Sequence, residues 1–443
     1  MKEFDKKSLP LDNDMKHEAV ISRIPTETLS HIFTFTLAPY RLNDEPAPWT
    51  IGAVCSRWRR IVISQPCFWV FIDLRFFQRE RFTGKFRLEI QLSRSASLPL
   101  NVAFSTPERA FTSEDASLLQ TIVMHVARWE TLSMMGPRAL YAHFHALMRD
   151  QFTLLRVLDV EMEYGHFGVD DGLGMDEDGV PLLVTFKDAP RLQQVTVNKI
   201  YYPCPLSLAL PSSQVLQFSG SNFWGGHLRT LRSTTNLVSC SLLVPPETDD
   251  LIVQGPIFLP HLLRLSVAAA LVLEYLETPA LQELHCHYEP PLLPFLRRQR
   301  QLQKLVIHDP PEVFQPGVWW VPGDADAPDL TPMVEAATTV TTLALMLPLP
   351  AAFVRDLPNL DMVPALACLA TRDMTGNFEA QKAFMHAVES RWKHGRLRCV
   401  KVSKAHFPWA PGILGRIELL QSQGMEFVVQ SYSKIKDEIG PDF

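Results

Sequence analysis

The sequence predicts an α/β protein: a short helical module followed by an irregular solenoid of strand–helix repeats, with a parallel sheet on the concave face. Two observations predict this architecture. Beyond residue 150, apolar residues recur as L-x-x-L-x-L at intervals of about 19 to nearly 40 residues. Ahead of them, two amphipathic stretches separated by prolines lie between residues 24 and 69. A chain of 443 residues is too long for one ordinary core and suits several domains or an elongated array.

The composition favours a folded protein and argues against a nucleic-acid binder. Hydrophobic residues make up 47% of the chain and charged residues 20%, a balance typical of globular proteins. The formal net charge is -6. A protein that grips phosphate backbones carries an excess of Lys and Arg over at least one domain, and no such segment stands out. We therefore expect no nucleic-acid partner.

The N-terminus and the cysteines indicate a cytoplasmic or nuclear protein. Residues 1–14, MKEFDKKSLPLDND, lack the apolar run of a secretory signal. The most apolar stretch, residues 340–354, is interrupted by Pro348 and Pro350 and is too short to span a bilayer. The 7 cysteines are odd in number and form no C-x-x-C pair, which fits reduced thiols packed as small apolar side chains. We expect no membrane association.

Two short amphipathic helices are predicted near the N-terminus. The first has an apolar stripe at Leu29, Ile32, Phe33 and Leu37, and Pro25 suits its first turn. The second has the same spacing at Ile51, Val54, Cys55, Trp58, Ile61 and Val62. The connection contains Pro39, Pro46 and Pro48 and is expected to be a loop. Two helices of this size bury little surface, so a partner is expected to cover what they leave exposed.

These two stretches resemble an F-box. The matching residues are Ile24-Pro25, Glu27, Leu29 and Ile32-Phe33, then Val54-Cys55 and Trp58-Arg59. The continuation SQPCFW, residues 64–69, resembles F-box proteins of the type numerous in mushroom-forming fungi. In that family the module docks on a Skp-type adaptor, which bridges to a cullin-RING ubiquitin ligase. The resemblance implies an adaptor-binding role for Ile24, Pro25, Leu29, Ile32, Val54, Cys55 and Trp58.

The interhelix loop is longer and richer in proline than the family pattern. The alternative interpretation is a helical hairpin that packs on the rest of the chain.

The second part of the chain carries the repeated apolar pattern. The copies are Leu155-Leu158-Val160, Leu192-Val195-Val197, Leu237-Cys240-Leu242, Leu262-Leu265-Val267, Leu281-Leu284-Cys286, Leu302-Leu305-Ile307, Val340-Leu343-Leu345, Leu366-Leu369-Ala370 (imperfect) and Leu397-Val400-Val402, with a degenerate copy near Val215, Leu216 and Phe218. Many of the intervals are those of leucine-rich repeats, although the Asn that regular repeats often place after the strand is absent. The last two apolar positions of each copy are expected to point into the core from a short strand.

These patterns divide the chain into five segments. They are a flexible N-terminus (1–19), the F-box-like module (20–74), linking or capping units (75–150), the leucine-rich-repeat-like solenoid (151–432) and a tail (433–443). Within the third segment, RLEIQLSRSASLPLNVAF is expected to supply two strands and a turn. The stretches LLPFLRRQRQ and EAQKAFMHAVESRWKHG, which lie between strands, look helical or irregular.

Polar residues between the apolar strand positions are the candidate contacts to a target protein. They are Thr196, Asn198, Glu283, His285, His287, Lys304, His308 and Lys401, with Gln194 and Arg264 as further outward positions. If their strands are neighbours, His287 and His308 occupy equivalent positions about 4.8 Å apart. A metal site or a pH-sensitive patch could follow from this pair, but chance exposure of polar residues on a concave face is the favoured interpretation.

Other motifs argue against catalysis. The acidic stretch DDGLGMDEDG, residues 170–179, places Gly174 and Thr185 where a calcium loop needs carboxylates, so we interpret it as an exposed insertion. The pair Trp319-Trp320 lies in a proline-rich loop that could be a recognition element or an aromatic plug. No G-x-S-x-G elbow, Walker loop or dinucleotide fingerprint occurs. We predict no catalytic residue, metal or cofactor.

The resemblance favours one function over two alternatives. The preferred hypothesis is substrate recruitment for ubiquitin ligation: the F-box-like module binds a Skp-type adaptor, and the concave face of the solenoid binds a target protein. A protein-interaction scaffold outside any ligase is the first alternative. A solenoid enzyme acting on polysaccharides is less favoured, because Asp159, Glu161 and Glu283 are scattered rather than paired.

Overall fold

The computed structural model separates the chain into two compact units, residues 1–100 and 101–443. The residues that the structure describes are 20–36, 47–74, 83–106, 111–148, 152–163, 182–198, 207–211, 214–221, 224–243, 255–308, 329–347, 349–372, 378–403, 409 and 412–439. The acidic stretch at 170–179 and the pair Trp319-Trp320 lie outside these ranges. Among the helices within them, none combines the length and the apolar character needed to cross a lipid bilayer.

The first unit is a helical module with an aromatic core. Its elements are η1 (Val20–Arg23), α1 (Thr26–Thr34), α2 (Ala47–Val54), α3 (Ser56–Ser64), η2 (Pro66–Trp69), β1 (Phe71–Asp73) and α5 (Gly84–Arg94). The buried core consists of Leu29, Phe33, Ile51, Ile61, Val62, Phe68 and Trp69. Phe33 contacts Trp58 with ring centroids 4.7 Å apart. The apolar stripes predicted for the two N-terminal helices therefore meet in one core.

Two details of the predicted helices are corrected. The single helix expected over residues 51–62 is two helices, because Cys55 is extended and its Sγ accepts a hydrogen bond from the Trp58 N–H at 3.5 Å, which starts α3. Pro48, expected in the loop, is a buried residue in the first turn of α2, where a missing N–H costs little. Pro39 and Pro46 lie outside the described residues.

The expected strand over RLEIQL is also wrong, since these residues belong to helix α5. Leu88 and Leu92 are four residues apart, a spacing that fits both an alternating strand and one face of a helix. The helix packs on the module: Trp49 Nε1 donates to Gln91 Oε1 at 3.2 Å, and Gln91 Nε2 donates to the Phe71 carbonyl at 2.6 Å. The first unit thus extends beyond residue 74.

The second unit is a parallel sheet with helices between its strands. The strands, in the order in which they neighbour one another, are β2 (Leu100–Ser105), β3 (Trp129–Pro137), β4 (Val157–Glu163), β6 (Gln194–Asn198), β8 (Gln217–Gly220), β9 (Ser239–Leu242), β11 (Arg264–Val267), β13 (Glu283–His287), β14 (Lys304–His308), β15 (Thr342–Met346), β16 (Cys368–Thr371), β17 (Cys399–Ser403) and β18 (Glu426–Gln430). Every register from β3 to β18 is parallel.

The connections contain helices and two small sheets. The helical elements are α6 (Ser113–Val123), η3 (Val126–Arg128), α7 (Arg138–Leu147), α8 (Trp224–Ser233), η4 (Ala270–Tyr275), α9 (Leu292–Arg298), α10 (Thr331–Ala336), α11 (Ala351–Asp356), α12 (Phe378–Lys393), α13 (Ile413–Ser422) and α14 (Tyr432–Ile439). The small sheets pair β5 (Leu182–Leu183) with β7 (Ser207–Leu208) and β10 (Ile257–Phe258) with β12 (Leu276–Glu277). The stretches near residues 292 and 378, expected to be helical or irregular, form the helices α9 and α12.

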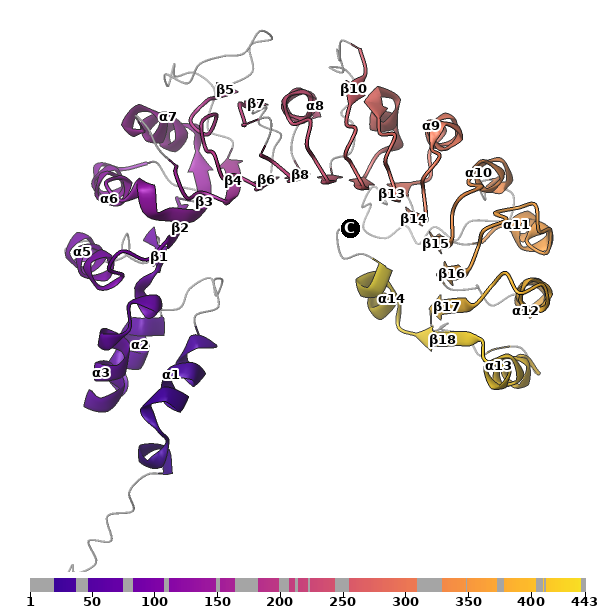
Figure 1. Ribbon diagram of the computed structural model, residues 1–443, viewed down its shortest axis with the longest axis horizontal. Coiled ribbons are helices and arrows are strands. Elements are labelled where there is room, and N and C mark those ends of the chain that lie inside the picture. Colours follow the sequence, from indigo (N-terminus) through magenta and orange to yellow (C-terminus); the bar gives the residue numbers. More distant parts are fainter. Residues whose placement is uncertain are drawn as a thin grey trace, which may run out of the picture. The chain divides into compact units, whose positions relative to one another are not determined.

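Within this unit the strands line the inner side and most helices lie on the outer side (Figure 1). The sheet curves with its strands on the inner side because neighbouring strands are about 4.8 Å apart, whereas packed helices need a spacing of about 10 Å. We call the strand surface that faces away from the outer helices the inner face. Helix α14 is different, because it lies on the inner side (Figure 1).

The repeat pattern predicted the strands. Each copy coincides with a strand, and its core positions are buried, as Leu158 and Val160 of β4 illustrate. The degenerate copy near Phe218 is β8. One core position is corrected: in β16 the register partner of Leu345 is Thr371, whereas Ala370 lies on the inner face.

The sheet also begins earlier than predicted, because β2 and β3 precede residue 151. In β3 the core positions are Trp129, Leu132 and Met134, which follow the same spacing with other residue types.

Candidate functional site

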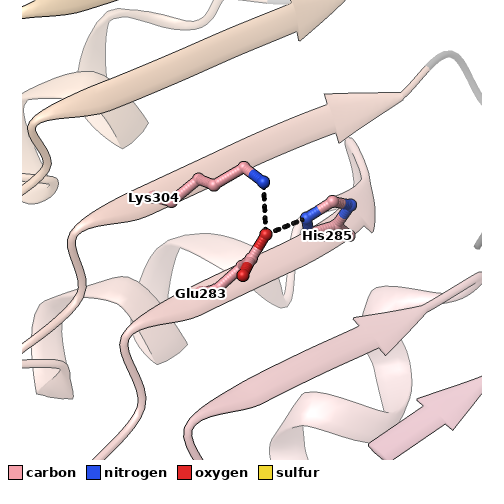
Figure 2. A network of polar contacts seen from close by, with 3 residues as sticks. All are labelled: Glu283, His285 and Lys304. Atoms are coloured by element: carbon pink, nitrogen blue, oxygen red, sulfur yellow. Dashed lines mark hydrogen bonds and ion pairs between the residues drawn. The ribbon is translucent and has the colours of Figure 1, made fainter. Parts of the chain in front are cut away.

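The leading candidate for a binding site lies on the inner face at β13 and β14. Glu283 and His285 are two residues apart on β13 and so point to the same side, and Lys304 is the register partner of Glu283 on β14. Figure 2 shows both partners converging on one carboxylate oxygen. His285 Nε2 lies 2.8 Å from Glu283 Oε1, and Lys304 Nζ donates to the same oxygen. The alternate residues Leu284 and Cys286 point into the core.

The electrostatics of this network keep the carboxylate ionised. The hydrogen bond with His285, together with the hydrogen bond and charge of Lys304, lowers the pKa of Glu283 to about 2 although partial burial opposes this change. An ionised carboxylate only accepts hydrogen bonds, so Nε2 of His285 carries a proton. The network therefore presents a binding partner with a negative charge on Glu283 and a positive charge on Lys304, both held in place by hydrogen bonds.

Two further histidines extend the site. His287 and His308 are register partners, as predicted, and their ring centroids are 6.0 Å apart. His285 lies 6.1 Å from His308 by the same measure. Chance exposure was the favoured interpretation, but the three side chains are only 6–7% exposed. The histidines are buried and not exposed because side chains on strands about 4.8 Å apart cover one another.

The metal hypothesis for these histidines gains no support. Among the described residues, no group of three or more His, Cys, Asp or Glu side chains is arranged to hold a metal ion. The three rings instead form a packed patch beside Glu283 and Lys304.

The inner face becomes apolar beyond the histidines. In register, His285 is followed by Val306, Ala344 and Ala370, and His308 is followed by Met346. Val306, Ala344, Met346 and Ala370 form a buried cluster with Ile435 of α14. We call the four strand residues the inner apolar patch. An apolar patch on this face was not predicted, and it is covered by the chain's own last helix.

Lys401 anchors the same helix. It is the register partner of Ala370, and its Nζ lies 2.7 Å from Glu438 Oε2 of α14. Gln430 Nε2 donates to the same carboxylate oxygen at 3.1 Å. The hydrogen bond to Glu438 raises the pKa of Lys401, and the bonds from Lys401 and Gln430 lower the pKa of Glu438. The predicted target contact Lys401 is therefore occupied by an intramolecular ion pair.

Thr196 and Asn198 lie elsewhere on the sheet. Both are on β6, which is separated from β13 by β8, β9 and β11. Asn198 Nδ2 donates to Asp159 Oδ1 on β4 at 3.0 Å, and burial raises the pKa of Asp159. The structure thus brings Glu283, His285, His287, Lys304 and His308 together but leaves Thr196 and Asn198 apart.

The six cysteines within the described residues divide into three environments, which corrects the expectation that the thiols are packed as small apolar side chains; Cys204 lies outside those residues. Cys240 and Cys286 are buried in the core, whereas Cys55 and Cys67 are exposed. Cys368 and Cys399 are half-buried register partners on β16 and β17 and are hydrogen-bonded to each other. They continue the row of Glu283, Lys304 and Thr342 along the inner face. Aligning the repeat copies would have shown this pairing, because both cysteines occupy the same place in the pattern.

The predicted adaptor-binding residues of the first unit occupy different environments. Leu29 is buried in the core, and Ile24 and Trp58 pack against it while half-buried. Pro25 and Cys55 are exposed, as are Ile32 at 45% and Val54 at 59%. Arg57 Nη2 donates to the Ile24 carbonyl at 2.5 Å, which joins the start of α1 to α3.

A scan of the chain against protein-family models gives no match, and a search of curated proteins gives none either.

Proposed function

We propose that the protein is a substrate-recognition adaptor of a Skp/cullin/F-box-type ubiquitin ligase, acting in the cytoplasm or nucleus. In this proposal the first unit docks on a Skp-type adaptor, and the inner face of the second unit binds a target protein. The chain performs no chemistry itself. It raises the rate of ubiquitin transfer by holding the target near the ligase at high effective concentration.

The observation that carries the proposal is apolar surface on the first unit. Ile32, Val54 and Ile63 are each more than 40% exposed, and Phe35 is 73% exposed. They belong to or directly follow the short helices that carry the F-box-like motif. Exposed apolar side chains on a small helical module offer a surface that a protein partner can cover.

The buried motif residues support the same proposal in a different way. Leu29 and Trp58 hold α1 and α3 in position, since Leu29 lies in the core and Trp58 packs on Phe33. Their role is to fix the geometry of the helices. The candidates for direct adaptor contact are then Pro25, Ile32, Val54 and Cys55, which are exposed.

The binding of a purified Skp-type adaptor tests the proposal. We expect the full chain to bind and the double variant Ile32→Asp/Val54→Asp to bind at least about tenfold more weakly, because two charges replace apolar contacts at the interface. Isothermal titration calorimetry measures the effect, and circular dichroism checks that the variant remains folded. Both side chains are largely exposed, so the substitutions leave the core intact.

The matched control is Leu414→Asp/Leu419→Asp on α13. These two leucines are 57% and 56% exposed but belong to the second unit, so this variant is expected to bind the adaptor like the unchanged chain. Equal weakening by both double variants would point to a general loss of solubility. A folded chain that does not bind any Skp-type adaptor would leave the non-ligase scaffold as the better account.

A further inference from the structure

Helix α14 covers a part of the inner face that is shaped for one aliphatic side chain. Ile435 is completely buried, and it packs with Val306, Ala344, Met346 and Ala370. Ala344 and Ala370 contribute small side chains to this cluster beside the larger Val306 and Met346. The inner apolar patch therefore receives the branched side chain of Ile435 from α14.

A polar contact fixes the same helix one turn further on. Glu438, three residues after Ile435, accepts hydrogen bonds from Lys401 at 2.7 Å and Gln430 at 3.1 Å. Residues three apart lie on one face of a helix, so Ile435 and Glu438 form a two-point contact. At the start of the helix, the Lys434 N–H donates to Ser431 Oγ at 3.4 Å.

The helix depends on this contact. It has 8 residues, too few for a stable helix in isolation. Among the side chains of α14 that the structure describes, Ile435 is buried against the sheet, and Glu438 holds an ion pair that is open to water. A short helix that follows the last strand and is held in part by an exposed ion pair can open locally without unfolding of the rest.

We infer that α14 is an intramolecular ligand of the target-binding site, and that a target displaces it by inserting an amphipathic helix with the same two-point chemistry. That helix carries a branched aliphatic residue and, three residues later, a carboxylate. The aliphatic side chain enters the inner apolar patch, and the carboxylate binds Lys401. This inference rests on the proposed function only in assigning target binding to the inner face, and it does not depend on the Skp-type adaptor.

A labelled peptide tests the inference on the full chain. The probe is a fluorescein-labelled peptide of residues 430–443, and the receptor is the full chain carrying Ile435→Asp, which removes the side chain that fills the patch. Fluorescence anisotropy is expected to show binding at least about tenfold tighter to this variant than to the unchanged chain, where α14 competes. A peptide that itself carries Ile435→Asp is expected not to bind.

A charge exchange makes the test specific for the polar contact. Adding Lys401→Glu to the Ile435→Asp chain is expected to weaken the unchanged peptide about tenfold, and a Glu438→Lys peptide is expected to recover most of the loss. The control chain with Leu414→Asp alters an exposed residue of α13 and is expected to bind the peptide no better than the unchanged chain. Equal binding of the probe to the opened and unchanged chains would overturn the inference, as would equal binding of the Ile435→Asp peptide.

Hydrogen exchange on the unchanged chain keeps the inference testable if Ile435→Asp does not fold. The amides of α14 are expected to exchange faster than those of β15, β16 and β17, and excess peptide is expected to speed α14 further. Protection of α14 equal to that of these strands contradicts a displaceable helix. Titration of the same chains with the Skp-type adaptor separates the two proposals, because adaptor binding concerns the first unit alone.

Discussion

The two units of this chain differ in the large side chains that they bury. The first unit buries an aromatic core around Phe33, Phe68 and Trp69, yet leaves aliphatic side chains such as Val54 exposed. The second unit buries charged and polar groups, among them Arg391 and the histidines of the inner face. Excess apolar surface is stabilised when a partner covers it, whereas a buried polar group is stable only with well-placed hydrogen bonds.

The two units should therefore be sensitive to different substitutions. In the first unit, substitutions at the surface should affect binding more than folding. In the second, substitutions of buried polar residues should affect folding first, because each removed group leaves partners without their hydrogen bonds.

Arg391 should give the largest effect on stability. It is fully buried on α12, and its guanidinium donates to the carbonyls of Leu357 at 2.6 Å, Asn359 at 2.7 Å and Val363 at 3.3 Å, as well as to that of Met362. Burial lowers the pKa of Arg391 to about 10, so it remains charged at neutral pH. Arg391→Met is expected to reduce the free energy of unfolding by about 3–5 kcal/mol, because several buried carbonyls lose their donor. Urea unfolding followed by circular dichroism measures this.

The control is an arginine whose hydrogen bonds lie at the surface. Arg416 binds Glu389 through two hydrogen bonds of 2.7 and 2.8 Å, but both side chains are partly exposed. Arg416→Met is expected to cost less than about 1 kcal/mol. Similar losses for the two variants would contradict the view that burial of the cation sets the cost.

Glu283 should give a pH-dependent effect of intermediate size. Its pKa in the folded chain, about 2, is below its ordinary value of 4.5. A lowered pKa means that the contribution to stability is present above pH 4.5 and is lost as the pH falls towards 2. Because the side chain is partly exposed, we expect a contribution of about 1–2 kcal/mol. Between pH 5.5 and pH 2.5, the free energy of unfolding should therefore fall less for Glu283→Gln than for the unchanged chain. Urea unfolding at both pH values measures the two losses.

A surface ion pair provides the comparison for Glu283. Glu130 Oε1 lies 3.6 Å from Arg156 Nη1, and both side chains are more exposed than those of the Glu283 network. Glu130→Gln is expected to leave the acid profile close to that of the unchanged chain. A profile for Glu283→Gln that also matches the unchanged chain would show that the inner-face network contributes little to stability.

The sequence predicted the repeated part of the fold better than the site. Strands with L-x-x-L-x-L were recognised because alternating apolar side chains are dictated by the strand itself. The unit built on Trp129 and Met134 was missed because unlike residues fill the same core positions. The pairing of His287 with His308 followed from equal positions in two copies, and β13 and β14 confirm it.

The position of α14 could not be predicted in the same way. Nothing near Ile435 in the sequence indicates that it packs on Val306 and Ala370, since these contacts depend on how far the array curves. The burial of His285 likewise depends on its neighbours on the sheet and not on its own strand. Long-range contacts of this kind are outside what a local pattern specifies.

The smallest predicted effect is a difference in alkylation rate between the thiols of the inner face. The hydrogen bond from Cys399 and the charge of Lys401 lower the pKa of Cys368, whereas the same pairing raises the pKa of Cys399. Burial raises the pKa of Cys240 to about 12. Because the thiolate is the reactive form, iodoacetamide at pH 7.5 is expected to modify Cys368 several times faster than Cys399, and Cys240 the slowest of the three. Peptide mapping by mass spectrometry over time measures the three rates.

A variant of the neighbouring thiol separates this mechanism from simple access. Cys399→Ala removes the hydrogen-bond donor while opening space beside Cys368. If the hydrogen bond stabilises the thiolate, alkylation of Cys368 slows by roughly three- to tenfold despite the easier access. If access controls the rate, alkylation becomes faster instead. Cys399→Ser keeps a hydroxyl donor at the same position, so under the hydrogen-bond mechanism it should retain most of the reactivity of Cys368.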